Sequence, residues 1–335
     1  MKNKLTKTSK ITTNLPILLL LLIVTNCKPN KKEAMPPEVT NELKTKAVLE
    51  YQIKAELGEG SFWNYDTQEL YWIDILNNQL HIYNPKTKTD RSLTTPSNIG
   101  TVVPIDNTRA VVALQDGIYI INTNSGETTL LSDVEHDIKT NRFNDGKCDP
   151  SGRFWVGSMA YDETPKASNL YMINAMGEAS LKLDSVTISN GIVWTKDKKT
   201  MYYIDTPTSE IKAFDYDDAT GAISNQRIVV KVNDSLGYPD GMAIDENDRL
   251  WVGMWNGNAV ICFDPITGSV VFKIEVPAHN VTSCAFGGKN LDTLYITTAR
   301  VDMTEDEQAK YPLAGSLFKA VPEVRGVKST FFKAE

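Results

Sequence analysis

The stretch Asp149-Pro150-Ser151-Gly152-Arg153-Phe154-Trp155-Val156-Gly157 returns later in the chain as Asp245-Glu246-Asn247-Asp248-Arg249-Leu250-Trp251-Val252-Gly253. The turn residues, the arginine and the Trp-Val-Gly segment recur in the same order, so the two stretches mark an internal repeat. Six strand-like segments belong to this series, with successive gaps of 40, 43, 48, 48 and 44 residues; they centre on Trp72, Val112, Trp155, Tyr203, Trp251 and Tyr295. A period of roughly 40–50 residues with several strands per unit is typical of a β-propeller.

Two sets of turn signals accompany the repeat. The first precedes each segment by about a dozen residues, at Glu59-Gly60, Ile99-Gly100, Asn144-Asp145-Gly146, Asn190-Gly191, Asp240-Gly241 and Thr282-Ser283. The second is hairpin-like and follows at 84–87, 122–126, 174–177, 215–221 and 264–268. Asn, Asp and Gly tolerate the positive φ that tight turns need.

Each unit therefore reads as a polar turn, an inner strand, two further strands, a hairpin and an outer strand. We predict an all-β fold, a six-bladed β-propeller with four-stranded blades, over residues 47–335. Residues 47–55 are expected to close the ring beside C-terminal strands near Leu317 and Phe331, because closure removes free sheet edges.

The start of the chain has the features of an export signal. A basic region precedes an apolar run of eight residues, 17–24, which is far short of the roughly 20 needed to span a bilayer. The string Val24-Thr25-Asn26-Cys27 resembles a lipobox, although Asn26 is an unusual residue there. We expect residues 1–26 to be a lipoprotein signal peptide, Cys27 to be the lipidation site, and residues 27–46 to be a disordered polar tether.

This reading predicts an exported bacterial lipoprotein that is membrane-anchored, in the periplasm or at the cell surface. A plain secreted protein and an uncleaved anchor are the alternatives. The membrane would be contacted through the lipid anchor only, and the oligomeric state is left open.

The net charge bears on the class of partner, and the cysteines bear on whether the chain forms disulfides. The formal net charge is −7, and removal of residues 1–26 takes away four lysines and no acid, which leaves about −11. A strongly negative chain argues against a nucleic-acid partner. Three cysteines remain after Cys27, namely Cys148, Cys262 and Cys284, and each lies in a strand-like run. We expect buried free thiols rather than a disulfide.

Four of the first-set turns carry a carboxylate or a carboxamide at the same repeat position, where the innermost strand begins. The residues are Glu59, Asn144, Asn190 and Asp240. Each could be a structural turn and nothing more, but the shared register predicts that they converge on the propeller axis. Crowded carboxylates raise one another's pKa, and a bound cation removes that cost.

Oxygen donors without thiolate or imidazole suit a hard divalent cation. We expect one such ion, Ca²⁺ first with Zn²⁺, Mn²⁺ or Mg²⁺ as alternatives, held by Glu59, Asn190 and Asp240. Asp240 is also the candidate catalytic residue, since it would accept a proton from the attacking water.

The string Arg142-Phe143-Asn144-Asp145-Gly146 is the most specific one in the chain. An arginine two residues before the turn would direct its guanidinium toward the same mouth of the channel, where it could hold an oxyanion or a polyhydroxylated ligand. A salt bridge between blades is the alternative for Arg142, and Asp145 could serve the turn itself. His279 lies just before the sixth inner strand and could approach the mouth.

Several strings together resemble the senescence marker protein/gluconolactonase family over roughly residues 57–327. They are Gly58-Glu59-Gly60, Arg142-Phe143-Asn144-Asp145-Gly146-Lys147, Ser189-Asn190-Gly191, Tyr203-Ile204-Asp205, Pro239-Asp240-Gly241-Met242 and Thr282-Ser283-Cys284-Ala285-Phe286-Gly287-Gly288. The resemblance implies a six-bladed propeller, one axial divalent metal and hydrolysis of sugar lactones. It also implies metal binding by Glu59, Asn190 and Asp240, and substrate binding by Arg142 and Asn144.

The chain departs from the family pattern at two places. Asp162, followed by Glu163, stands where a substrate-contacting glutamate is expected, so either acid is a candidate for substrate binding. Ser61 stands where proline is usual. The predicted function is metal-dependent hydrolysis of a small sugar lactone. The alternatives are a non-catalytic metal- or ligand-binding surface lipoprotein, which the Asp162 change would favour, and a propeller esterase or phosphotriesterase.

Overall fold

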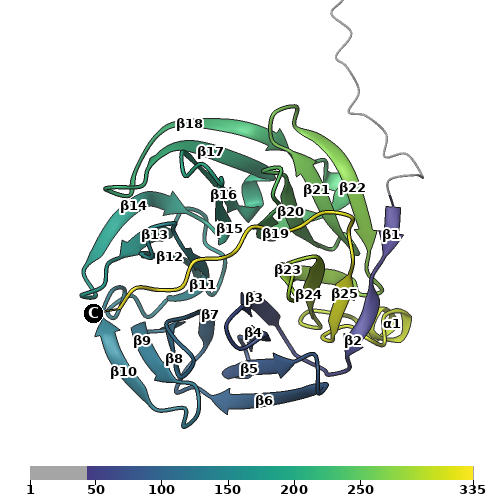
Figure 1. The fold of residues 1–335 in the computed structure, drawn as a ribbon, viewed down its shortest axis with the longest axis horizontal. Helices are drawn as coiled ribbons and strands as arrows, with labels where there is room; N and C mark the ends of the chain where they lie inside the picture. Colours follow the sequence, from purple (N-terminus) through teal and green to yellow (C-terminus); the bar gives the residue numbers. More distant parts are fainter. Residues whose placement is uncertain (1–43, 335) are drawn as a thin grey trace, which may run out of the picture. The chain divides into compact units, whose positions relative to one another are not determined.

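Six blades of four antiparallel strands are arranged in a ring in the computed structural model, which describes residues 44–334 (Figure 1). The predicted six-bladed propeller is confirmed. From the innermost to the outermost strand, blade 1 consists of β3 (Gly58–Asn64), β4 (Glu69–Asp74), β5 (Gln79–Asn84) and β6 (Thr89–Thr94). Blade 2 consists of β7 (Ile99–Pro104), β8 (Arg109–Leu114), β9 (Gly117–Asn122) and β10 (Thr128–Ser132). Blade 3 consists of β11 (Asn141–Cys148), β12 (Phe154–Ala160), β13 (Ser168–Ile173) and β14 (Ala179–Val186).

Blades 4 to 6 follow the same order. Blade 4 consists of β15 (Ser189–Trp194), β16 (Thr200–Asp205), β17 (Glu210–Asp217) and β18 (Ala222–Lys231). Blade 5 consists of β19 (Tyr238–Ile244), β20 (Leu250–Trp255), β21 (Ala259–Asp264) and β22 (Ser269–Glu275). Blade 6 consists of β23 (Asn280–Gly287), β24 (Thr293–Ala299), β25 (Leu317–Ala320) and β2 (Val48–Tyr51). Short helical elements lie between strands, at η2 (Thr206–Thr208), η3 (Asp234–Leu236) and α1 (Glu305–Lys310), the last with a capping box from Thr304 to Glu307.

Strand β2 closes the ring. It pairs antiparallel with β25, with Leu49 opposite Phe318, so the predicted closure by residues 47–55 beside Leu317 is confirmed. The expected strand near Phe331 is wrong, because no strand includes that residue. Before β2, strand β1 (Lys44–Lys46) pairs in parallel with β22. Residues 44–46, which the predicted tether includes, thus form a strand, since a sheet edge pairs through the backbone and accepts lysines on its outer side.

The second strand of each blade is buried on both faces because neighbouring blades cover it. Trp155 on β12 and Trp251 on β20 are almost fully buried. Each indole N–H donates to the aspartate that begins the repeated stretch, at 2.9 Å from Asp149 Oδ2 and 2.9 Å from Asp245 Oδ2 respectively. The internal repeat is thus a structural repeat, in which one aspartate accepts the hydrogen bond of the buried indole N–H.

The five expected hairpins connect third and outer strands as predicted. The first-set turns differ from the prediction, because they lie inside the innermost strands rather than before them. Pairing of β3 with β4 shifts register after Glu59, and comparable shifts occur on all six innermost strands. These are β-bulges, which re-aim a side chain within a strand. Gly60 adopts φ +59° at the first bulge, which glycine accepts without strain.

After β25 the chain crosses one face of the ring (Figure 1). Its backbone is fixed first on blade 5, where Glu246 N–H donates to Arg325 O at 2.9 Å, and then on blades 2 and 3, where Phe332 and Lys333 N–H donate to Pro104 O and Gly152 O. We refer to residues 326–333 as the C-terminal strap.

Cys148, Cys262 and Cys284 are free and buried, as expected. Among the described residues, no helix is long and apolar enough to cross a membrane. The predicted signal peptide 1–26, the lipidation site Cys27 and the tether up to residue 43 lie outside the described residues.

Candidate functional site

A cavity of about 680 Å³ lies at one mouth of the central channel. The bulges of four innermost strands place their polar residues on its wall: Glu59 from β3, Asn144 from β11, Asn190 from β15 and Asp240 from β19. The exposed fractions of these four residues are 4–7%. Residues far apart in the sequence are therefore gathered as the repeat register predicts, while their chemical roles stay predictions.

Close approach of the innermost strands requires glycine beside the polar residues. A Cβ atom on Gly191 would lie 2.7 Å from the backbone oxygen of Asp240, and one on Gly241 would lie 2.8 Å from Ser283 Oγ. The polar-residue-glycine pairs thus have two functions here. The first residue faces the cavity, and the second lets the next strand come close.

Two oxygen atoms on the cavity wall have no hydrogen-bond partner in the described part of the chain, although they are buried. They are Asn190 Oδ1 and Asp240 Oδ1. The Asn190 amide is oriented by its Nδ2, which donates to Thr206 Oγ1 at 3.0 Å. Buried acceptors without donors are costly and call for a ligand, water or ion. Glu59 adds a third oxygen donor, since only its Oε2 accepts a protein hydrogen bond, from Gly60 N at 3.0 Å.

The electrostatics of the cavity also favour a cation. Burial raises the pKa of the Glu59 carboxyl well above its usual range, and the charges of Asp240 and Asp145 add to the effect. Burial likewise raises the pKa of Asp240, with Asp145 as the next cause. A positive ion between Glu59 and Asp240 would reverse these shifts.

The donor set fits a hard ion. No group of three or more His, Cys, Asp or Glu side chains is arranged for metal binding within residues 44–334. The candidate site instead combines two carboxylates with one carboxamide, a mixture that Ca²⁺ accepts readily and that leaves positions for water or substrate.

Arg142 lies on the same wall and is 7% exposed. Its Nη1 donates to Asn144 Oδ1 at 2.7 Å and to Phe143 O at 3.1 Å. No carboxylate of the described residues lies within 4.0 Å of it, so the alternative of a salt bridge between blades is wrong. Burial lowers the pKa of Arg142, while Tyr161 and Glu59 oppose that effect. The other N–H groups of its guanidinium have no acceptor among residues 44–334.

The two acids after β12 occupy different positions. Asp162 is exposed and its Oδ1 accepts hydrogen bonds from Thr164 N at 3.1 Å and Thr164 Oγ1 at 2.8 Å. Its side chain therefore stabilises the turn and does not reach the cavity wall. Glu163, with φ 56°, lines the cavity. Glu163 and Arg142 therefore line the same cavity and Asp162 does not, while the contact of either acid with substrate stays a prediction.

Several wall residues carry no motif that sequence reasoning could use. Tyr161, Tyr238 and Trp255 line the cavity from strand ends, where a single aromatic residue resembles any blade residue. His279, named as a possibility, does line the cavity. Its ring stacks on Tyr311 with centroids 5.5 Å apart, and its Nε2 lies 3.6 Å from Glu307 Oε1.

Comparisons with known proteins agree with the propeller fold. The SMP-30/Gluconolactonase/LRE-like region matches residues 57–300. A Bacillus subtilis (strain 168) protein named as a candidate sugar lactone lactonase, YvrE, is 39% identical over 86% of this chain and 99% of its own length. Regucalcin of Danio rerio is 37% identical over 79% of this chain and 90% of its own. A solved structure of Agrobacterium tumefaciens regucalcin, described as a calcium-binding protein, superposes with TM-score 0.81, 25% identity and coverage of 87% and 98%.

Proposed function

This chain belongs to the SMP-30/gluconolactonase/LRE-like family, and we propose that it hydrolyses a small sugar lactone at the axial cavity with the help of one divalent cation. The observation that supports the proposal best is the pair of buried, unpartnered oxygens, Asn190 Oδ1 and Asp240 Oδ1, on the wall that also holds Glu59. Three oxygen donors aimed into one cavity fit a hard cation, with Ca²⁺ as the first candidate.

Glu59, Asn190 and Asp240 would hold the ion. When bound, it would supply a Lewis acid that polarises the lactone carbonyl. Asp240 would offer its unpartnered Oδ1 to the ion, and its second carboxylate oxygen would accept the proton of the attacking water. A carboxylate that both faces the cation and accepts the proton stays ionised at neutral pH despite its burial.

Arg142 and Asn144 would orient the ring. The Asn144 amide is itself held, because its Nδ2 donates to Ser189 O at 2.8 Å and its Oδ1 accepts from Arg142. Their remaining N–H groups would donate to sugar hydroxyls or to the ring oxygen. A fixed pair of donors positions the substrate before reaction, which is where much of an enzyme's rate advantage arises.

The test is hydrolysis of glucono-δ-lactone by purified protein after chelation and after resupply of Ca²⁺, Mn²⁺, Mg²⁺ or Zn²⁺. Activity should disappear and return. Asp240→Asn should lower kcat by roughly 10²–10⁴-fold, while Asp162→Asn, at an exposed turn beside the cavity, serves as the matched control.

Activity that ignores the chelator would refute the metal requirement. Binding of metal and lactone without turnover would support the ligand-binding alternative, and a higher kcat/KM on aryl esters or phosphotriesters would support the third candidate function.

We also propose that the protein is exported and anchored through a lipid on Cys27. The support is the lipobox-like string 24–27 after an apolar run of eight residues. Cells fed a labelled fatty acid should incorporate label into the wild type and not into Cys27→Ser. Equal labelling of both proteins would overturn the proposal.

A further inference from the structure

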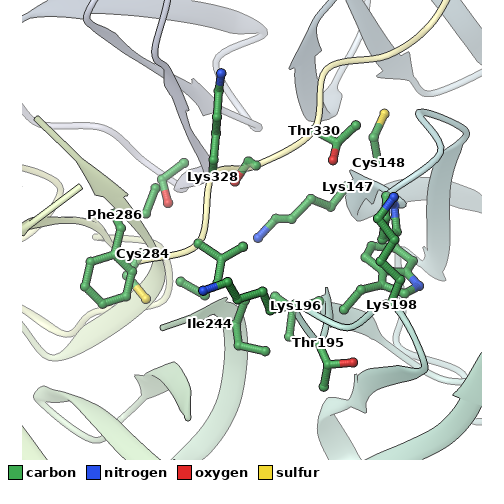
Figure 2. Close-up of a pocket in the computed structure, with 18 residues that line it drawn as sticks. Lys147, Cys148, Thr195, Lys196, Lys198, Ile244, Cys284, Phe286, Lys328 and Thr330 are labelled. Atoms are coloured by element: carbon green, nitrogen blue, oxygen red, sulfur yellow. The ribbon is translucent and has the colours of Figure 1, made fainter. Parts of the chain in front are cut away.

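A second cavity, of about 180 Å³, lies at the opposite end of the channel (Figure 2). The innermost strands connect the two ends. Strand β11 places Asn144 at the first cavity and Lys147 at the second, and β19 does the same with Asp240 and Ile244. The second cavity is therefore built by the carboxyl ends of the strands that build the candidate lactone site.

The C-terminal strap covers this cavity. It is fixed at one side by Val327 N–H, which donates to Ile244 O at 3.1 Å, and at the other by Phe332. Between these two points, the backbone N–H groups of 328–330 have no hydrogen-bond acceptor among the described residues, and neither have the hydroxyls of Ser329 and Thr330, which line the cavity. The strap thus brings two hydroxyl groups, Ser329 Oγ and Thr330 Oγ1, to the cavity wall without an acceptor among the described residues.

The wall is strongly basic in a protein of net charge −7. Four lysines line it, and no aspartate or glutamate of the described residues does. Two of these lysines have partners elsewhere: Lys198 Nζ lies 3.2 Å from Asp218 Oδ2, and Lys328 Nζ lies 3.4 Å from the centroid of the Tyr65 ring. Figure 2 shows Lys328 directed away from the centre of the cavity.

The other two lysines are placed differently: Lys147 is half-buried and extends toward the centre of the cavity, whereas Lys196 is exposed at its rim (Figure 2). Neither has a carboxylate within 4.0 Å in residues 44–334. Lys147 Nζ donates one hydrogen bond, to Met242 O at 2.7 Å, which leaves two N–H groups free. Burial lowers the pKa of Lys147, and Asp145, higher in the channel, opposes this. Two ammonium groups that share a cavity repel each other, and a bound anion would relieve that repulsion.

We propose that the cavity under the C-terminal strap binds a small oxyanion between Lys147 and Lys196, with the strap donors on its third side. Since one water takes up about 30 Å³ of the liquid, a cavity of about 180 Å³ has room for a phosphate or a short carboxylate. Inorganic phosphate and polyhydroxy carboxylates such as aldonates share the chemistry that the site would recognise. The proposal does not depend on lactonase activity.

Isothermal titration of the full chain with sodium phosphate, and separately with sodium gluconate, tests this. We expect saturable binding of one anion per chain. Lys196→Gln removes one charged donor and should weaken binding about 10-fold, the equivalent of one charge-assisted hydrogen bond. Lys199→Gln, a nearby exposed lysine off the cavity wall, is the matched control and should bind as the wild type does.

Further variants show where on the protein the anion binds, and the comparison of the two anions shows which of them the site prefers. Glu246→Gln, at an exposed turn off both cavity walls, should leave phosphate binding unchanged, whereas Lys147→Met, checked for folding by its thermal midpoint, should abolish it. The anion that binds more tightly, phosphate or gluconate, identifies whether the natural ligand is a phosphate or a polyhydroxy carboxylate. Absence of saturable binding by either anion, or phosphate binding that is unchanged in both Lys196→Gln and Lys147→Met, would overturn the proposal whatever the lactonase assay shows.

Discussion

Replacement of Glu50 by glutamine should weaken the closure of the ring. Glu50 lies on β2, the strand from the amino end that completes blade 6, and its side chain is 1% exposed. Its carboxylate accepts hydrogen bonds from Tyr83 Oη at 2.9 Å and Lys88 Nζ at 2.5 Å on blade 1, and from Lys319 Nζ at 2.9 Å on β25. One carboxylate therefore joins the first and last blades.

The magnitude follows from these three bonds. A hydrogen bond to a charged acceptor contributes about 1 kcal/mol more than a neutral one, so three bonds give about 3 kcal/mol. Lys88 and Lys319 are 52% and 33% exposed, and their charges are partly screened by solvent. The glutamine amide would also direct a donor toward an ammonium group. We expect Glu50→Gln to lower the free energy of unfolding by about 2–3 kcal/mol at pH 7.

The pH dependence has a defined sign. Burial alone raises the pKa of Glu50, but the hydrogen bonds from Lys88, Lys319 and Tyr83 outweigh it and hold the pKa below its ordinary value of 4.5. A depressed carboxyl pKa stabilises the folded state above the unfolded pKa, and the stabilisation disappears as pH falls through the folded value. The difference between wild type and variant should therefore be complete well above pH 4.5 and should shrink as pH falls below 4.5 through the lowered pKa of the folded state.

Urea denaturation followed by tryptophan fluorescence measures both quantities, with Glu323→Gln, an exposed glutamate without an ion pair, as control. A Glu50→Gln effect below about 0.5 kcal/mol at pH 7, the range of ordinary surface substitutions, would refute the reasoning. An effect of equal size at pH 3 and pH 7 would refute the electrostatic part of it.

Three further predictions concern the cavity. Glu163→Gln should raise KM for a sugar lactone about 10-fold through loss of a charged hydrogen bond, while Asp162→Asn should leave KM unchanged in the same steady-state assay. Gly191→Ala should destabilise the fold by about 1–3 kcal/mol in thermal unfolding, because its Cβ would lie 2.7 Å from the Asp240 backbone oxygen. Because the pKa values of Glu59 and Asp240 are raised and metal ligands must be deprotonated, metal affinity measured by calorimetry should fall as pH drops from 8 to 5.5.

The ring and its register could be predicted from the sequence because the repeat consists of Asn, Asp and Gly residues with strong preferences for turns, spaced between β-branched and aromatic residues that favour strands. At the first hairpin, Asn84 Oδ1 accepts hydrogen bonds from Lys86 N and Thr87 N, a contact that the Asn-x-x signature implies directly. The shared position of Glu59, Asn190 and Asp240 was likewise readable, since equivalent repeat positions take equivalent places around the axis.

The sequence could not distinguish a tight turn from a bulge, since both favour a polar residue before glycine. It also gave no sign that the C-terminal strap would cross the ring. Phe331 stacks on Tyr65 at 4.3 Å between ring centroids and Phe332 contacts Phe154, contacts that join the tail to blades 1 and 3 and have no local sequence signal. The different positions of Asp162 in the turn and Glu163 on the cavity wall were equally unreadable, since the positive φ of Glu163 has no local sequence signal.

The charges along β11 connect the two proposals. Asp145 interacts electrostatically with Glu59 and Asp240 toward one mouth and with Lys147 toward the other. The buried axis is thus acidic at one end and basic at the other. Asp145 and Lys147 offset each other's charge, but they cannot neutralise the remaining charges at both ends. Removing charges from water without a partner is costly. A cation at the acidic end and an oxyanion at the basic end would complete the compensation, so each ion should raise the thermal midpoint of the folded chain independently of the other.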